Sequence, residues 1–408
     1  MSILRKYTEV SLMLRIFIGL VIGAVLALLV PNLSFPGVLG HLFVNALKAI
    51  APVLVAVLVT NSVARAGSGL GPRFRTVIIL YMVTTLLAAI VAVIGSFLFP
   101  VSIRLQNAAQ QSAPGALSDV FMDLVGNLVA NPINSVASAN YLGVLFWSIV
   151  VGLALKLHAT SHTLEVVNDF ALAVSEVVRW VIQFAPFGIL GLVYTSVSES
   201  GMEIFTDYGR LLLLLVGCML FSALVLNPLI VSLFLKRNPY PYVFMCLKES
   251  GLQAFFTRSS AANIPINMAL CKKMGLDEKF YSVSIPLGST INMDGAAITI
   301  TVMTLATCNT LGIEVSFLSA IFLSIVAVVA ACGVSGVAGG SLLLIPLACS
   351  LFGISNDIAM QTVAVGFIIG VVQDSVETAL NSSGDALFTI TAELHDRAKK
   401  EKAEIKAK

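Results

Sequence analysis

Polar residues that carry oxygen ligands interrupt a long apolar stretch in the second half of the chain. Gly288, Asn292, Asp294 and Gly295 all fall within the otherwise apolar segment 280–303. A helix is expected from about 285 to beyond 303, with the glycines weakening it and letting the backbone open. An Asp in hydrocarbon costs about 2.5–3.5 kcal/mol on insertion scales, so it needs a compensating partner. A carboxylate, an amide and freed carbonyls are hard ligands for a small cation. The alternative is that both side chains are satisfied inside a helix bundle without an ion.

A second polar set lies on the last apolar segment. Asp374, Thr378, Asn381 and Asp385 are spaced by four, three and four residues, so they share one helix face, and Glu377 lies beside that face. Clustered carboxylates need a counter-charge, bound cations or a proton. The expected counter-charge is an arginine in a polar segment upstream, Arg258. The alternative is a purely structural ion pair between this arginine and Asp374 or Glu377.

The composition sets the class of protein. Of 408 residues, 58% are hydrophobic and only 11% are charged, in long apolar runs. This predicts an all-α polytopic membrane protein. A net charge of +2 gives no sign of a nucleic-acid partner. The six cysteines form no CxxC pair and are expected to be small core residues rather than disulfides or zinc ligands. The first apolar run does not resemble a cleavable signal peptide.

The apolar runs predict the order of the spans. In the first part we expect spans at about 16–31, 41–64, 76–100, 141–156, 166–197 (interrupted at 186–188) and 211–235. The more polar stretch 101–137 is expected to be an external excursion. Basic residues near the start and at 65–75 place both regions on the cytoplasmic side. The tail 393–408 carries both signs of charge and is expected to be cytoplasmic, solvated and partly disordered.

Two short apolar segments have polar or glycine-rich centres. The segment 254–265 has Thr257, Arg258, Ser259 and Ser260 in its middle, which suggests a hairpin with its tip at the serines. The segment 331–341 is broken by four glycines. Paired interruptions of this kind point to a transporter binding site. The alternative is small-residue packing between ordinary spans.

These motifs resemble those of the dicarboxylate/amino acid:cation symporters, which have the glutamate-transporter-like fold. The resemblance covers nearly the whole chain and rests on 257–260 (TRSS), 288–295 (GSTINMDG), 336–339 (GVAG) and 381–385 (NSSGD). It implies eight transmembrane helices plus two re-entrant helical hairpins in inverted repeats, usually as a homotrimer. It also implies a scaffold (about 11–65 and 138–200), and a transport domain (span three and 208–392) that moves like an elevator through lipid.

The resemblance also implies a set of site residues, with sodium as the coupling ion. One sodium site would use the Asp385 carboxylate and carbonyls of Gly288, Asn292 and Asn381. A deeper site would use Asp294, Asn292, Thr84, Thr85 and Tyr81. A third would use Thr290 with carbonyls near Ala331, Cys332 and Val334. The substrate amino group would meet Asp374, and its carboxylate would meet Ser260, Asn381 and hairpin amides around Val337. Thr378, Glu377, Arg258 and Ser259 complete the substrate-binding set.

Four positions depart from the family pattern. Members that carry acidic substrates have an arginine where this chain has Glu377, and a carboxylate there would repel an acidic side chain. A small hydroxyl side chain, as in serine or threonine, could hydrogen-bond to Glu377 or Thr378. The usual threonine of the third sodium site is Val334, the usual hairpin proline is Ala338, and the acidic residue ahead of span two is His41.

The sequence therefore predicts a sodium-coupled symporter of small neutral amino acids, most simply L-serine and L-threonine, in a bacterial inner membrane. Coupling to protons, transport of other small amino acids or dicarboxylates, and sodium-independent exchange stay open. An intramembrane aspartyl protease also needs two Asp in helices, and Gly384-Asp385 fits its motif in part. Its second glycine is Ser382 here, and no HExxH metal motif is present.

Overall fold

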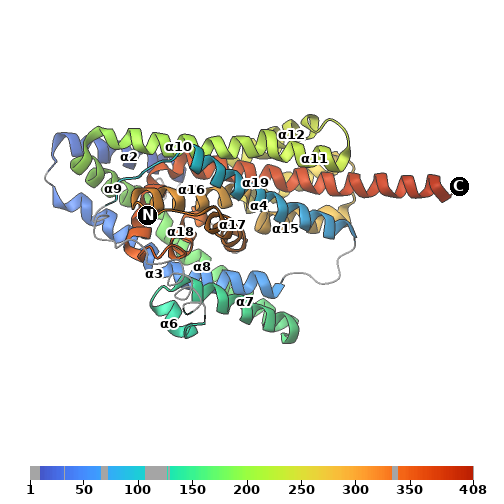
Figure 1. Ribbon diagram of the computed structural model, residues 1–408, viewed down its shortest axis with the longest axis horizontal. Helices are drawn as coiled ribbons and strands as arrows, with labels where there is room; N and C mark the ends of the chain where they lie inside the picture. Colours follow the sequence, from blue (N-terminus) through green and yellow to red (C-terminus); the bar gives the residue numbers. More distant parts are fainter. Residues whose placement is uncertain are drawn as a thin grey trace.

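A bundle of helices makes up every part of the chain that the structure describes, and these parts contain no strand (Figure 1). The computed structural model describes residues 10–31, 33–65, 72–105, 126, 129–332 and 339–407, without the side chains of 13, 200 and 402–407. The α-helices are α2 (Leu12–Leu29), α3 (Ser34–Arg65), α4 (Pro72–Leu98), α6 (Pro132–Ala137), α7 (Tyr141–His158), α8 (Ser161–Gln183), α9 (Ala185–Ser200), α10 (Ile204–Phe221), α11 (Asn227–Leu235), α12 (Tyr240–Cys246), α13 (Leu252–Thr257), α14 (Ser260–Lys273), α15 (Glu278–Ile291), α16 (Asp294–Thr310), α17 (Phe317–Ala331), α18 (Ile345–Ser350) and α19 (Asn356–Ala407). Short 3₁₀ turns lie at η2 (Gly201–Glu203) and η5 (Gly340–Leu344), and π-helical stretches at η3 (Ser222–Leu226) and η4 (Leu247–Gly251).

The helices have the length and apolar character of membrane spans. Within the described residues, six are long and apolar enough to cross a membrane, or seven if the bent pair α8–α9 counts as one span. That pair bends by 51° just before Pro186, which confirms the interruption expected there. The protein is therefore a multi-pass membrane protein.

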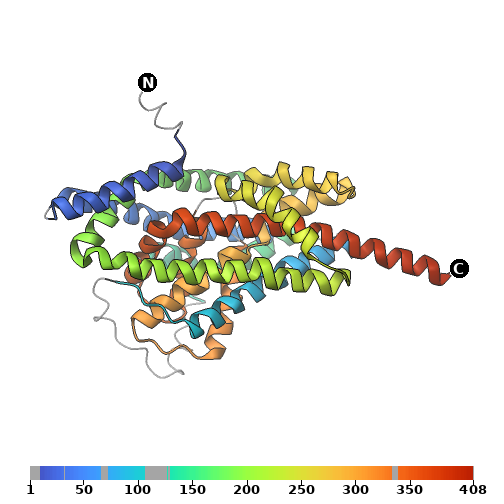
Figure 2. The same ribbon diagram turned by 90° about the horizontal axis from the view of Figure 1, so that it is seen from above.

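The helices pack as two groups that meet along α19. In one group, α2 lies along α9, and α3 packs against α7, α8 and α9. In the other, α4, α10, α15 and α16 pack against α19, and α13 and α14 lie on the side of α19 opposite to α10 (Figure 2). The candidate polar residues belong to this second group. Most of them are buried, so helix packing on all sides fixes their position.

Two breaks in the helices fall at the polar motifs. The helix expected from about 285 to beyond 303 opens, as its glycines suggested: α15 ends at Ile291 and α16 begins at Asp294. At the expected hairpin tip Arg258 adopts a left-handed conformation (φ +53°) and ends α13, and the next helix, α14, packs against α13. Ser259 then caps α14 by accepting a hydrogen bond from the amide of Ala262.

The expected disorder of the charged tail is wrong for residues 393–407, which continue α19 as helix (Figure 1). Ion pairs one turn apart stabilise this part, with Arg397 on Glu393 at 2.5 Å and Lys400 on Asp396 at 2.9 Å. Glu393 is also not solvated, since its side chain is only 1% exposed.

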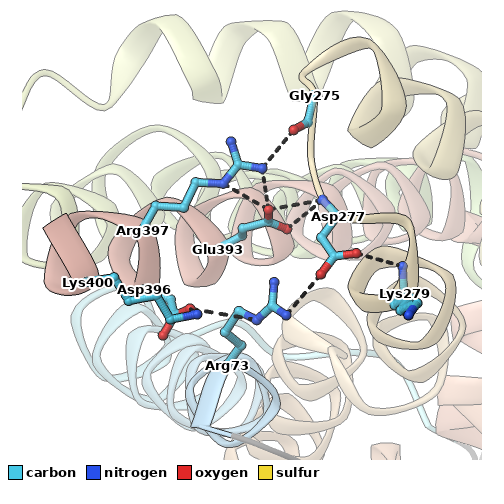
Figure 3. Close-up of polar contacts among 8 residues, drawn as sticks. All are labelled: Arg73, Gly275, Asp277, Lys279, Glu393, Asp396, Arg397 and Lys400. Atoms are coloured by element: carbon cyan, nitrogen blue, oxygen red, sulfur yellow. Dashed lines mark hydrogen bonds and ion pairs between the residues drawn. The ribbon is translucent and has the colours of Figure 1, made fainter.

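A polar network fastens this part of α19 to two other elements (Figure 3). Both Glu393 carboxylate oxygens accept the amide N–H of Asp277, at 3.0 and 3.1 Å, and Arg397 donates to the Gly275 carbonyl at 2.7 Å. Arg73, at the start of α4, donates to Asp277 at 2.9 Å. This hydrogen bond holds the pKa of the Asp277 carboxyl below its usual range. The network fixes the turn before α15, and thereby the register of α15 against α4 and α19.

Candidate functional site

The first buried carboxylate, Asp385, faces the break between α15 and α16. Its Oδ1 accepts a hydrogen bond from the Asn292 side chain at 3.0 Å, and the same amide group donates to the Asn381 carbonyl at 2.9 Å. Asp385 Oδ2 and Asn292 Oδ1 are both buried and have no hydrogen-bond partner in the described chain. A Cβ at Gly288 would lie 2.9 Å from Asp385 Oδ1, so only glycine lets α15 approach this closely. The structure thus brings Gly288, Asn292, Asn381 and Asp385 together, the set that the family resemblance implies for one cation.

The second buried carboxylate, Asp294, begins α16 on the other side of the break. The Thr85 hydroxyl lies 3.1 Å from Asp294 Oδ1 and 2.8 Å from the Tyr81 carbonyl, and it can donate to only one of them. The Thr84 hydroxyl also reaches the Tyr81 carbonyl, at 3.1 Å. The Tyr81 hydroxyl is 3.1 Å from the Asp385 carbonyl. Of the predicted deeper set, Thr84 and Thr85 therefore lie against the Asp294 carboxylate, and Tyr81 lies one turn before them on α4.

The two buried carboxyl groups of this region lack a cationic partner in the described chain. No Lys, Arg or His of the described chain forms an ion pair with Asp294 or Asp385, and both residues are 0% exposed. The described residues also contain no cluster of three His, Cys, Asp or Glu side chains that could hold a metal ion. The donors are instead single carboxylates with amide, hydroxyl and carbonyl oxygens, which suit a hard alkali cation. The orphaned oxygens and the glycine at the break fit a bound cation.

The predicted third cation set is only partly described. Thr290 and the end of α17 are near each other, since Cys332 Sγ lies 3.7 Å from the Ile291 carbonyl. The Cys332 carbonyl, however, accepts a hydrogen bond from Ser62 of α3 at 3.4 Å, and the Thr290 hydroxyl donates within its own helix. Ala331 ends α17, and Val334 lies outside the described residues.

Arg258 and Asp374 form the expected ion pair. Arg258 Nη2 and Nε lie 2.6 and 2.7 Å from Asp374 Oδ2, with side chains 11% and 5% exposed. The Gly339 amide donates to the other oxygen of Asp374 at 3.3 Å. Beside the pair is a cavity of about 10 Å³, lined also by residues of α2, α8 and α9, which has room for about one water. The Arg258 guanidinium therefore binds the same carboxylate that the resemblance assigns to the substrate amino group.

Glu377 does not pair with Arg258. Its Oε2 accepts hydrogen bonds from three neutral side chains, at distances of 2.5 to 2.9 Å, from Thr299, Ser341 and Gln373. Gly295 makes this position possible, because a Cβ there would lie 2.8 Å from the Glu377 Cα. Glu377 is therefore held rigidly at the contact between α16 and α19.

The remaining predicted substrate residues lie around the same space. Ser260 is the first residue of α14 and is 7% exposed. The Asn381 side chain accepts the Gly295 amide at 2.7 Å, and its NH2 group makes only a long contact of 3.7 Å with the Met293 sulfur. The Thr378 hydroxyl donates to the Asp374 carbonyl at 2.7 Å. Val337 lies outside the described residues.

Sequence reasoning missed several polar residues that hold this site. Thr299 and Ser341 were assigned no role, although both hydrogen-bond to Glu377. Asn227 was read only as part of an apolar span, yet its side chain donates to Asp294 at 3.2 Å. A signal was present, because an amide followed by a proline in mid-span is costly in a membrane and calls for a partner.

Comparison with known proteins agrees with this geometry. The model of the sodium:dicarboxylate symporter family matches residues 12–394. The chain is 59% identical over 390 residues to the serine/threonine transporter SstT of Bifidobacterium adolescentis, covering 95% of this chain and 91% of that protein. It is 55% identical to the protein of the same name from Streptococcus thermophilus and 54% identical to that from Streptococcus agalactiae, covering at least 95% of each chain. The protein is thus a transporter and not an enzyme, and it belongs to the sodium:dicarboxylate symporter family.

Proposed function

We propose that the protein is a sodium-coupled symporter that imports small neutral amino acids, chiefly L-serine and L-threonine, across a bacterial inner membrane. The observation that carries the coupling is the pair of buried carboxylates, Asp294 and Asp385, which have no cationic partner in the described chain and lie beside orphaned oxygens. Sodium bound there would remove the cost of holding two charges in a dry core. The names of the relatives support the choice of substrate.

The site supports a defined way of binding the amino acid. Its ammonium group would replace the Arg258 guanidinium on Asp374, because both are cations that suit the same carboxylate. Its carboxylate would accept hydrogen bonds from Ser260, from the Asn381 NH2 group and from amides at the hairpin tips. Thr378 lies one residue from Glu377 on α19 and would contact the side chain.

Glu377 would set the preference among side chains. A second carboxylate beside it would meet like charge in a water-poor site, which disfavours aspartate and glutamate. Because its Oε2 already accepts three hydrogen bonds, Glu377 cannot easily move away to relieve the repulsion. A serine or threonine hydroxyl adds no charge and can donate a hydrogen bond.

The sodium ions would occupy the sets described above. Asp385 with the carbonyls of Gly288, Asn292 and Asn381 would hold one ion. Asp294 with Asn292 and the oxygens of Tyr81, Thr84 and Thr85 would hold another. Thr290 with carbonyls at the end of α17 would hold a third.

The same proposal gives the two helix groups different tasks. The group of α2, α3, α7, α8 and α9 would be the scaffold of a homotrimer, and α4 with α10–α19 would move as the transport domain through lipid. Segments 240–273 and 317–350 would be re-entrant hairpins, which makes eight spans in all, with both termini cytoplasmic. Polar contacts that join the groups include Lys48 with Asp357, Ser62 with the Cys332 carbonyl, and Tyr208 with Ser196.

Uptake of labelled serine into proteoliposomes tests the proposal. Inward gradients of sodium, potassium or protons are compared, with excess threonine or aspartate as competitors. We expect uptake only with sodium, blocked by threonine and not by aspartate. Uptake driven by protons alone would refute sodium coupling, and inhibition by aspartate would refute the role of Glu377.

A further inference from the structure

Asn227 is a buried amide in the middle of the α10–α11 span, in contact with the deeper carboxylate. It is 2% exposed, and its Nδ2 donates to Asp294 Oδ2 at 3.2 Å. Thr85 reaches the other oxygen, Oδ1, at 3.1 Å. The two neighbours therefore fix the Asp294 carboxylate from both sides, from α4 and from the α10–α11 span.

The backbone before Asn227 is distorted in a way that positions it. A π-helical turn, Ser222–Leu226, precedes it, and the Asn227 amide pairs with the Ser222 carbonyl five residues back. The next residue, Pro228, has no N–H, and the Leu224 carbonyl instead lies 3.3 Å from the Tyr240 hydroxyl. A π turn shifts the following side chains around the helix and is common at functional sites. Here the shift directs Asn227 toward Asp294.

The amide has a free acceptor on its other side. Its NH2 group is used on Asp294, and Asn227 Oδ1 is buried with no hydrogen-bond partner among the described residues. A cavity of about 10 Å³, the volume of about one water, is lined by Asn227 together with residues of the first hairpin and α19, including Ser383 and Gly384. An unpaired buried carbonyl oxygen is unfavourable, which points to a bound ligand at Asn227 Oδ1.

We infer that Asn227 is a positioning residue of the deeper cation site, because its NH2 group orients the Asp294 carboxylate for the ion. The inference rests on the proposed sodium coupling. It adds the α10–α11 span to a site that the family resemblance builds only from α4 and the break at 292–295.

Equilibrium sodium binding to the purified full-length protein tests this, without transport. The melting temperature is measured against sodium concentration for the native protein, Asn227→Leu and Asn227→Ala, with choline replacing sodium. Losing a hydrogen bond to a charged group should raise the half-stabilising sodium concentration at least about tenfold in both variants. In an Asp294→Asn background, Asn227→Ala should cause no further shift, because both changes act on one interaction.

A matched control is Asn263→Ala. Asn263 is 0% exposed and donates to Ser250 and Ser382, and it also has an unpaired Oδ1, but it has no contact with Asp294. It should lower the melting temperature without moving the sodium midpoint. An unchanged midpoint in Asn227→Ala, or an equal shift in Asn263→Ala, would overturn the inference. If the native protein itself showed no stabilisation by sodium, the proposed function would fail instead.

Discussion

Replacing Gly288 by alanine is a sharp test of the first cation site. A Cβ at this position would lie 2.7 Å from the Tyr81 hydroxyl oxygen and 2.9 Å from Asp385 Oδ1. Neither atom can move freely, because Tyr81 is 0% exposed and its hydroxyl contacts carbonyls on α15 and α19. Overpacking of this kind costs about 1–3 kcal/mol. If most of this cost appears when the carboxylate must hold the ion, sodium binding weakens by roughly 5- to 150-fold, since 1.4 kcal/mol is tenfold.

Gly217→Ala is the matched control. Gly217 lies within α10, and a Cβ there would meet nothing within 4 Å. Alanine should stabilise the helix by up to about 1 kcal/mol through its higher propensity and leave sodium dependence unchanged. Both variants are assayed by serine uptake at a series of sodium concentrations and by sodium-dependent melting. A folded Gly288→Ala protein with the native sodium midpoint would show that Asp385 does not hold a coupling ion.

Three further changes test other parts of the site. Asp385→Asn should raise the sodium concentration needed for half-maximal serine uptake at least about tenfold. The control, Asp169→Asn at an exposed position, should leave that concentration unchanged. Equal sodium midpoints in the two variants would remove Asp385 from the ion site. Glu377→Arg should weaken serine uptake and allow aspartate to compete; if serine uptake stays normal and aspartate stays excluded, the specificity argument is wrong. Arg258→Met leaves Asp374 buried and without its cation, so the free energy of unfolding without serine should fall by about 3–5 kcal/mol. Added serine should stabilise this variant more than the native protein. A smaller gain with serine would refute competition for Asp374.

Local signals in the sequence were enough to predict the breaks and the main carboxylates. Glycine, asparagine and aspartate inside apolar runs are costly in a membrane, so each marks a place that needs a partner. The opening at 292–293 was expected from Gly288, Asp294 and Gly295, and the turn near Arg258 from the polar run 257–260. The spacing of Asp374 and Asp385 followed from helical periodicity, and the structure confirms that both are buried on α19.

Partners from other helices could not be predicted in the same way. Ser341 and Thr299 both donate to Glu377, but they are 36 and 78 residues from it in the chain. Their contact depends on how α16 and η5 rotate against α19, which is decided by packing of the whole bundle rather than by any local pattern. The register of the tail helix likewise depends on Glu393, which looked like a solvated charge and is instead the buried centre of a network.

The buried acids of this protein are compensated in two different ways, and the difference bears on coupling. Asp374 is neutralised by Arg258, so in the proposed binding mode a substrate ammonium would exchange with a cation already present. Asp294 and Asp385 have only neutral donors among the described residues, so a cation can add without displacing one. Asn381 connects the two proposed cation sites, because its carbonyl accepts from the Asn292 amide group that also donates to Asp385, and its side chain accepts the Gly295 amide next to Asp294. In the proposed function the Asn381 NH2 group would also bind the substrate carboxylate, so ions that order Asn381 would link ion and amino acid binding through one residue.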